Sequence, residues 1–324
     1  MTDILVVGDT TNGKLASATA ELITAAGNIV GDIGVGLVGT SLQEAARAAN
    51  SIGARTIYTM EDHKLDGPSI YPKVDAFSQL CQQLEPRVIL VSKNSHGLDF
   101  GPRLAFSLSA GLAQDCIRVG EDDETGRVVA TRPVYGGSAM ATVTFSGDGP
   151  QVVVLREKSY EPASHDSLES GNLVQVEVNL GSSGDQVKSV REVGSQTKGV
   201  RLEDAEFVIA GGRGLGGPEP FGTLEELASL LGGAVGASRA ACDAGWVNRN
   251  YQVGLTGRTI SPNVYLTVGI SGASQHMAGC SGSRNIIAIN KDREANIFKE
   301  ARFGVVGDWN AILPSFLETV RELV

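Results

Sequence analysis

Two nearly uninterrupted apolar runs near the C-terminus constrain the fold more than any other feature of the chain. Residues 264–270 (VYLTVGI) and 284–290 (RNIIAIN) are rich in Val and Ile and are joined through a turn of small and polar residues. Such runs are typical of strands in a parallel sheet that is covered on both faces. Because ligands of open parallel sheets bind beyond the carboxyl ends of the strands, the turn predicts a binding site.

The same pattern extends through the rest of the C-terminal half. Further strands are expected at 207–212, 234–238 and 303–308, with helices over 224–231 and 309–324. Strands that alternate with helices indicate a doubly wound parallel sheet. We therefore predict a C-terminal domain of this class over residues 195–324.

The N-terminal half begins with a similar alternation of strand and helix. Strands are expected at 4–8, 33–39, 55–60 and 87–92, and helices at 14–26, 42–52, 74–84 and 102–112. From about residue 115, strand follows strand, at 116–122, 127–137, 140–146, 151–157 and 173–180. We interpret these later strands as antiparallel additions that complete an N-terminal α/β domain over residues 1–190. The polar segment 181–198 is expected to contain the linker between the two domains.

Composition excludes several classes of function. A length of 324 residues favours two domains, and a formal net charge of −10 argues against a nucleic-acid partner. No apolar run approaches the roughly 20 residues of a membrane span, and the opening strand leaves no visible signal peptide. The four cysteines and four histidines are isolated in sequence. We expect reduced thiols and no metal centre.

Two glycine-rich turns resemble phosphate-binding loops. Residues 8–14 match GxxxxGK, but Leu15 follows where a magnesium-binding Ser or Thr is required, so an ordinary turn is the better interpretation. Residues 212–217 match GxGxxG between a strand and a helix, a context in which backbone amides cradle a pyrophosphate. This second match is weak alone, and Arg213 within it could equally be a surface residue.

Polar residues follow the carboxyl ends of separate predicted strands. They are Arg213, Ser238, Arg239, Ser271, Gln275, His276, Asn290 and Asp308. Each has an ordinary alternative: Arg239 could pair with Asp243 or Glu219, and Asp308 could cap the last helix. Since these strand ends share one edge of the sheet, a single extended dinucleotide would explain all of them. No nucleophile–base pair or paired carboxylates accompany them, which favours a cofactor-holding site over acid–base catalysis.

Five segments resemble the alpha subunit of electron transfer flavoproteins in order and spacing. They are GGRGLGGPE (211–219), GASRAACDAGW (236–246), QVGLTG (252–257), YLTVGISGASQHMAG (265–279) and NKDREANIFKEARFGVVGDW (290–309). The resemblance covers essentially the whole second domain and is looser in the first, which carries no cofactor motif in that family. It implies that the second domain binds FAD.

The resemblance assigns cofactor contacts residue by residue. The matched positions are Arg213, Ser238, Arg239, Val253, Gly254, Leu255, Thr256, Ser271, Gly272, Ala273, Ser274, Gln275, His276, Asn290, Asp308 and Trp309. Arg213 matches an arginine against the flavin ring, and His276 matches a residue facing flavin N1 and O2. Val253–Thr256 match a loop near flavin N5, whereas Asn290 and Asp308–Trp309 match positions toward the ribose and adenine.

Four of these positions are expected to tune the flavin rather than to catalyse a reaction: Arg213, Arg239, Thr256 and His276. Reduction places negative charge around N1 and O2, and nearby guanidinium and imidazole groups stabilise that charge and raise the potential. Two positions depart from the family pattern. Leu255 stands where many members have Gln, and Ser274 stands where an aliphatic residue is usual.

By this resemblance the chain is an FAD-bound electron carrier paired with a beta subunit, in the cytoplasm. It would accept electrons from dehydrogenases, such as the acyl-CoA dehydrogenases of fatty acid beta-oxidation. It would pass them to a downstream acceptor such as a quinone oxidoreductase, and whether the complex also bifurcates electrons stays open. Two alternatives remain: a stand-alone NAD- or FAD-dependent oxidoreductase, with His276 as its proton-transfer residue, and a non-enzymatic nucleotide sensor.

Overall fold

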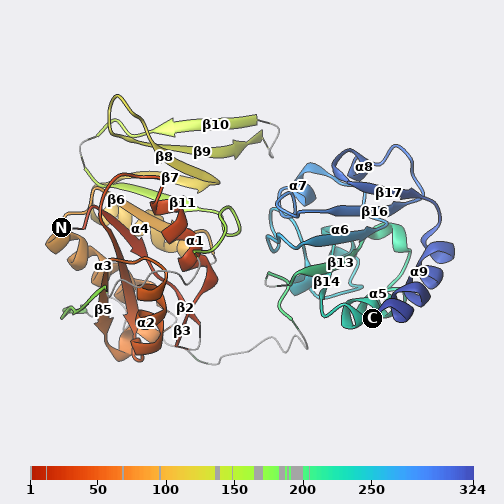
Figure 1. Ribbon diagram of the computed structural model, residues 1–324, viewed down its shortest axis with the longest axis horizontal. Coiled ribbons are helices and arrows are strands. Elements are labelled where there is room, and N and C mark those ends of the chain that lie inside the picture. Colours follow the sequence, from red (N-terminus) through yellow and green to blue (C-terminus); the bar gives the residue numbers. More distant parts are fainter. Residues whose placement is uncertain are drawn as a thin grey trace. The chain divides into compact units, whose positions relative to one another are not determined.

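The computed structural model describes the chain except residues 1, 12, 68, 95, 136–138, 148, 164–170, 182–186, 188–189, 191–199 and 204. The chain divides into two compact units (Figure 1). One unit contains Met1–Tyr135 and Ala139–Glu192, and the other contains Val193–Val324. Most of the expected linker, 181–198, lies outside the described residues.

A seven-stranded parallel sheet forms the centre of the N-terminal unit. Its order is β12 (Asn172–Gln175), β5 (Thr56–Glu61), β4 (Ile33–Gly39), β1 (Ile4–Val7), β6 (Val88–Ser92), β11 (Gln151–Leu155) and β7 (Gly111–Cys116). Alternate residues of its central strands enter two separate cores, as Ile4 and Leu5 do. Helices α1 (Ser17–Ala26) and α2 (Gln43–Ser51) cover one face, and α3 (Tyr71–Leu84) and α4 (Gly97–Ser107) cover the other.

The prediction of antiparallel additions is confirmed for three of the five late strands and is wrong for the other two. Only β8 (Arg118–Glu121), β9 (Val128–Val134) and β10 (Ala139–Thr144) form an antiparallel sheet. By contrast, β11 runs parallel between β6 and β7, and β12 runs parallel beside β5. Every residue of β11 is buried, which is why its sequence, QVVVL, is a continuous apolar run.

Two helices have other bounds than the sequence predicted. Lys14 and Leu15 lie in a short strand, β3, paired with β2 (Thr10–Thr11) around Gly13, whose φ of 78° is left-handed. Leu15 therefore packs from a hairpin and not from a helix. The helix expected at 102–112 is α4, which ends at Ser107 because Ser109 is left-handed, with a φ of 51°. Gly111 and Leu112 belong to β7.

The C-terminal unit is a doubly wound sheet with five parallel strands. Its order is β14 (Ala234–Ala237), β13 (Phe207–Gly211), β15 (Val264–Val268), β16 (Ile286–Asn290) and β17 (Phe303–Val306). From β13 the chain passes to β14 on one side and then returns to β15 on the other. The strand order thus reverses at β13, where a ligand crevice is expected.

Different elements cover the two faces of this sheet. Helices α5 (Phe221–Leu230) and α9 (Trp309–Leu323) bury Leu224 and Leu313 against one face. On the other face, loops and α8 (Ile297–Glu300) bury residues such as Ile260 and Ile297. Four short elements lie in the connections after the strands. They are the helices α6 (Arg239–Asp243) and α7 (Ser274–Met277) and the 3₁₀ turns η4 (Arg213–Leu215) and η5 (Arg249–Tyr251). Within the described ranges, no helix is both long enough and apolar enough to cross a membrane.

Candidate functional site

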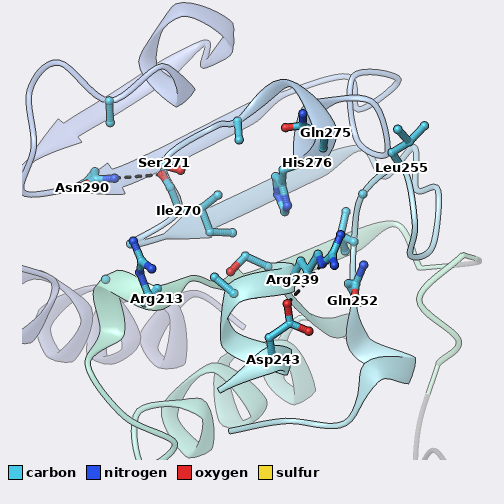
Figure 2. A pocket seen from close by; sticks show the side chains of 18 of the residues that line it. Arg213, Arg239, Asp243, Gln252, Leu255, Ile270, Ser271, Gln275, His276 and Asn290 are labelled. Carbon is cyan, nitrogen blue, oxygen red and sulfur yellow. Dashed lines mark hydrogen bonds and ion pairs between the residues drawn. The ribbon is translucent and has the colours of Figure 1, made fainter. Parts of the chain in front are cut away.

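A pocket of about 660 Å³ opens at the carboxyl ends of the strands in the C-terminal unit. It gathers most of the residues that the sequence singled out: Arg213, Ser238, Arg239, Val253, Gly254, Leu255, Thr256, Ser271, Ala273, Gln275, His276 and Asn290. Figure 2 shows the labelled ones among them, such as Arg213, His276 and Asn290, around the same space. The lining residues come from the ends of β13, β14, β15 and β16 and from the loops nearby. Its volume lies within the range of small-molecule and cofactor sites.

Other residues that line the pocket were not among the predicted contacts. They are Gly214, Ala240, Asp243, Gln252, Gly269, Ile270, Asp292 and Ala295. Asp243, Gln252 and Asp292 carry polar groups there. The sequence held a hint for two of them, since Asp243 is one helical turn from Arg239 and Gln252 opens the QVGLTG segment. Gln252 Nε2 donates to Thr256 Oγ1 at 3.0 Å, which fixes the loop's one hydroxyl.

The glycine loop after β13 does not act as a phosphate cradle. The amide of Gly212 donates to the carbonyl of Val268 at 2.8 Å, and the amide of Gly214 donates to the carbonyl of Gly269 at 3.0 Å. These glycines instead allow two backbones to touch, because a Cβ on Gly214 would lie 2.8 Å from Cα of Gly269. The GxGxxG match therefore joins the ends of β13 and β15 and places Arg213 at the pocket.

A second close approach joins the 252–257 loop to the turn after β15. Gly254 has a φ of 142°, and a Cβ there would lie 2.9 Å from the carbonyl oxygen of Gln275. The amide of Leu255 donates to the same carbonyl at 2.7 Å. Leu255 is 45% exposed, so its side chain stands at the surface of the pocket. The absence of a side chain at Gly254 thus allows the 252–257 loop to contact the turn that carries Gln275 and His276.

Two arginines give the pocket its positive charge. Arg213 is exposed and has no acidic partner within 4.0 Å in the part of the chain that the structure describes. Arg239 pairs with Asp243, Nε to Oδ2 at 3.2 Å, which is the salt bridge considered from the sequence, and its side chain is 67% exposed. Both guanidinium groups are accessible to an anionic ligand.

Among the described residues, His276 and Gln252 are the two buried polar side chains that line the pocket. Burial lowers the pKa of His276 to about 4, with the backbone of Val253 opposing the shift, so the imidazole is neutral at physiological pH. Nε2 lies 2.8 Å from the hydroxyl of Tyr265. Nδ1 is buried without a hydrogen-bond partner in the described chain. An orphaned nitrogen at a pocket wall fits a site that a ligand completes.

Four of the predicted contacts lie outside the lining of the pocket: Gly272, Ser274, Asp308 and Trp309. Asp308 Oδ1 accepts from the amide of Asn310 at 3.0 Å, so it caps α9, as the alternative interpretation held. Trp309 Nε1 donates to the carbonyl of Gly214 at 3.2 Å and supports the glycine loop. Gly272 packs against Ile297, where a Cβ would lie 2.3 Å from the backbone nitrogen.

Asn290 holds the end of β16 at the pocket. Its Nδ2 donates to the carbonyl of Ile270 at 2.9 Å, and its Oδ1 accepts from the amide of Asp292 at 3.0 Å (Figure 2). The other phosphate-loop match, at 8–14, places Gly8, Asp9 and Thr10 at a smaller pocket of about 130 Å³ in the N-terminal unit. Lys14 is exposed and lies 3.9 Å from Glu44. All four cysteines are unpaired and buried.

Comparison with protein families identifies both units. Residues 4–180 match the electron transfer flavoprotein domain, and residues 201–281 match the electron transfer flavoprotein FAD-binding domain. The "Electron transfer flavoprotein subunit alpha" of Megasphaera elsdenii is 38% identical over 98% of this chain and 96% of its own length. The protein of the same name from Bacillus subtilis is 38% identical over 99% of this chain and 98% of its own length. The one from Thermoanaerobacterium thermosaccharolyticum is 36% identical over 99% of this chain and 98% of its own length.

The fold, the pocket and these matches define a two-domain flavoprotein whose C-terminal unit is an FAD-binding domain. The chain belongs to the alpha-subunit family of electron transfer flavoproteins and functions in electron transfer.

Proposed function

We propose that FAD lies along the pocket at the carboxyl edge of the C-terminal sheet. Arg213 contacts the flavin ring, Val253–Thr256 border its N5 side and His276 faces N1 and O2. Ser238 and Arg239, with the run from Ser271 to His276, hold the pyrophosphate and ring. The adenosine half extends from Asn290 toward Asp308 and Trp309. The observation that carries this proposal is one pocket joining most of the expected contacts.

The physical chemistry of the donors supports this assignment. Two accessible guanidinium groups and an unpartnered buried imidazole nitrogen suit a ligand with a pyrophosphate and ring carbonyl groups. FAD supplies the redox chemistry when it is bound. The residues of this chain bind it, orient it and set the charge around it, and the neutral His276 offers a hydrogen bond rather than a proton.

The proposed role is that of a carrier paired with a beta subunit. The N-terminal domain, residues 1–190, packs on that subunit, and residues 195–324 hold FAD. The carrier takes electrons from dehydrogenases, such as the acyl-CoA dehydrogenases of beta-oxidation. It delivers them to an acceptor such as a quinone oxidoreductase, in the cytoplasm. An electron-bifurcating complex and a stand-alone oxidoreductase are the competing roles.

The experiment is to co-express the chain with its beta subunit and to measure bound flavin, mass and electron transfer. A one-to-one heterodimer that contains FAD and is reduced by an acyl-CoA dehydrogenase would support the carrier. A colourless monomer that binds NAD would overturn it. A heterodimer that is reduced by NADH and drives two acceptors would instead favour bifurcation.

Variants test the site itself. Arg213→Gln is expected to lower the flavin midpoint potentials and weaken FAD binding, because it removes an accessible positive charge from the pocket. Arg321→Gln is the matched control, since Arg321 is also exposed but pairs with Glu226 between α9 and α5. Unchanged potentials and affinity in Arg213→Gln would contradict the assigned position of the flavin ring.

A further inference from the structure

Tyr265 is a fully buried tyrosine of β15 that lies behind the pocket and does not line it. Its hydroxyl oxygen is 2.8 Å from Nε2 of His276. The two rings are stacked, with centroids 6.1 Å apart and planes inclined by 24°. In the described part of the chain, the hydroxyl of Tyr265 makes no other hydrogen bond.

The positions of the protons follow from the need to satisfy buried donors. Neutral imidazole carries one N–H donor and one bare acceptor nitrogen, and a phenol carries one O–H donor. If Nε2 held the proton, it would donate to Tyr265 and leave the phenol O–H without an acceptor. If Tyr265 donates to Nε2, the phenol is satisfied and the imidazole proton sits on Nδ1. Each arrangement leaves one donor unpaired, but the first also leaves Nδ1 as a bare acceptor without a partner, whereas the second leaves only Nδ1–H, on the ring that lines the pocket.

Nδ1 then becomes a donor held ready for a ligand. His276 is 7% exposed and lines the pocket, and Nδ1 has no partner of regular geometry in the described chain. Figure 2 shows the ring extending from α7 toward the space between Ile270 and Arg239. The backbone of Val253 lies near the ring of His276 and favours a proton on it.

We propose that Tyr265 is a positioning residue for the cofactor site. Its hydroxyl donates to Nε2, fixes the Nδ1–H tautomer of His276 and holds the ring so that Nδ1–H donates to a carbonyl oxygen of the cofactor. This inference rests on the proposed function for the identity of the acceptor. The tautomer itself depends only on residues of this chain.

The first test needs no variant and no cofactor. The chain is co-expressed with its beta subunit, labelled with ¹⁵N at histidine and stripped of flavin, and the two ring nitrogens of His276 are recorded by NMR. A protonated Nδ1 and a bare Nε2 are expected. A protonated Nε2 would overturn the proposal, whether or not the heterodimer later proves to bind FAD.

The second test removes the hydroxyl alone. Tyr265→Phe is expected to keep the fold, to mix the two tautomers of His276, and to weaken FAD binding by about 3- to 10-fold, the size of one net hydrogen bond. Tyr58→Phe is the matched control, because the hydroxyl of Tyr58 is also buried and bonds Thr2 Oγ1 at 2.7 Å within the N-terminal unit. It should leave FAD affinity and the tautomer unchanged.

A double variant separates positioning from general stability. In a His276→Asn background, Tyr265→Phe should cause no further loss of FAD affinity, because its effect passes through the histidine. An equal loss in both backgrounds would show a purely structural role and overturn the proposal. If the wild-type heterodimer takes no FAD at all, the proposed function fails, while the tautomer measurement still decides the role of Tyr265.

Discussion

Nε of Arg239 donates to Oδ2 of Asp243 across one turn of α6, at 3.2 Å, and the other oxygen of that carboxylate lies 3.2 Å from Arg249. The negative charge of Asp243 thus lies beside Arg239, a cation that we propose contacts the cofactor (Figure 2). The pair is exposed, so it contributes little to folding, about 0–1 kcal/mol. Its effect should lie in the electrostatics of the pocket.

Asp243→Asn should therefore raise the flavin midpoint potentials by tens of millivolts and tighten FAD binding a few-fold, on the order of the effect of one partly screened charge. The melting temperature should barely change. Spectroelectrochemistry and flavin titration measure the two quantities. Asp99→Asn breaks an i,i+4 pair of the same kind, with Arg103 in the N-terminal unit, and should change neither. Equal responses of the two variants would contradict the role of Asp243.

Gly214→Ala should damage the site through the backbone. A Cβ at Gly214 would lie 2.8 Å from both Cα and the carbonyl oxygen of Gly269, so two backbone segments must separate. Overpacking of this kind costs about 1–3 kcal/mol, and here it would also move Arg213. Lower thermal stability of the C-terminal unit and lower FAD content are expected. Gly222→Ala is the control, because its Cβ would meet nothing within 4 Å.

The strands around the site could be predicted because burial on both faces leaves a direct mark on sequence. β13, β15 and β16 are short apolar runs, and the polar residues that follow them were found by position alone. The same signal was present in β11, whose QVVVL is fully buried, but its place between β6 and β7 depends on pairings distant in sequence. Periodicity does not specify such partners.

The sequence also could not show which groups accept hydrogen bonds from the backbone amides. The glycines at 212 and 214 predicted a phosphate cradle, yet their amides are used by carbonyls at the end of β15, more than 50 residues later. Likewise, Asp308 has the residue type for a ribose contact and for a helix cap, and only the structure shows the cap. The sequence did not single out Tyr265, because its bond to His276 joins a strand to the turn that follows it.

Glu21 should make the stability of the N-terminal unit depend on pH. It is a buried residue of α1, and desolvation raises its pKa from 4.5 to about 7, opposed by the backbone amide of Lys158. Because the folded pKa is the higher one, the stabilisation present below pH 4.5 is lost as the pH rises toward 7. The full loss is about 3 kcal/mol.

Glu21→Gln removes the titrating proton and nearly preserves the shape. The variant should exceed the wild type in stability by about 1–3 kcal/mol above pH 7, and the difference should shrink as the pH falls toward 4.5. Calorimetry at several pH values measures it. Glu225→Gln, on the exposed side of α5, is the control, and its stability difference from the wild type should not change with pH. A gain that is independent of pH would exclude titration of Glu21 as its cause.

Leu255→Gln tests a departure from the family pattern at the pocket. The side chain of Leu255 is 45% exposed, and its amide already bonds the carbonyl of Gln275, so the substitution changes the side chain without disturbing the loop. A glutamine amide there could donate to the flavin, and one net hydrogen bond of about 1 kcal/mol corresponds to about 40 mV in a one-electron couple. We therefore expect potentials that differ by tens of millivolts, on the order of that value, with an unchanged melting temperature.

The matched control for this last variant is Leu255→Met, which keeps an apolar chain of similar volume and adds no donor. It should leave the potentials at the wild-type values. If Leu255→Met and Leu255→Gln shift the potentials equally, the change comes from altered packing at the pocket mouth. If neither shifts them, residue 255 does not face the flavin, and the assignment of the 252–257 loop to its N5 side is wrong.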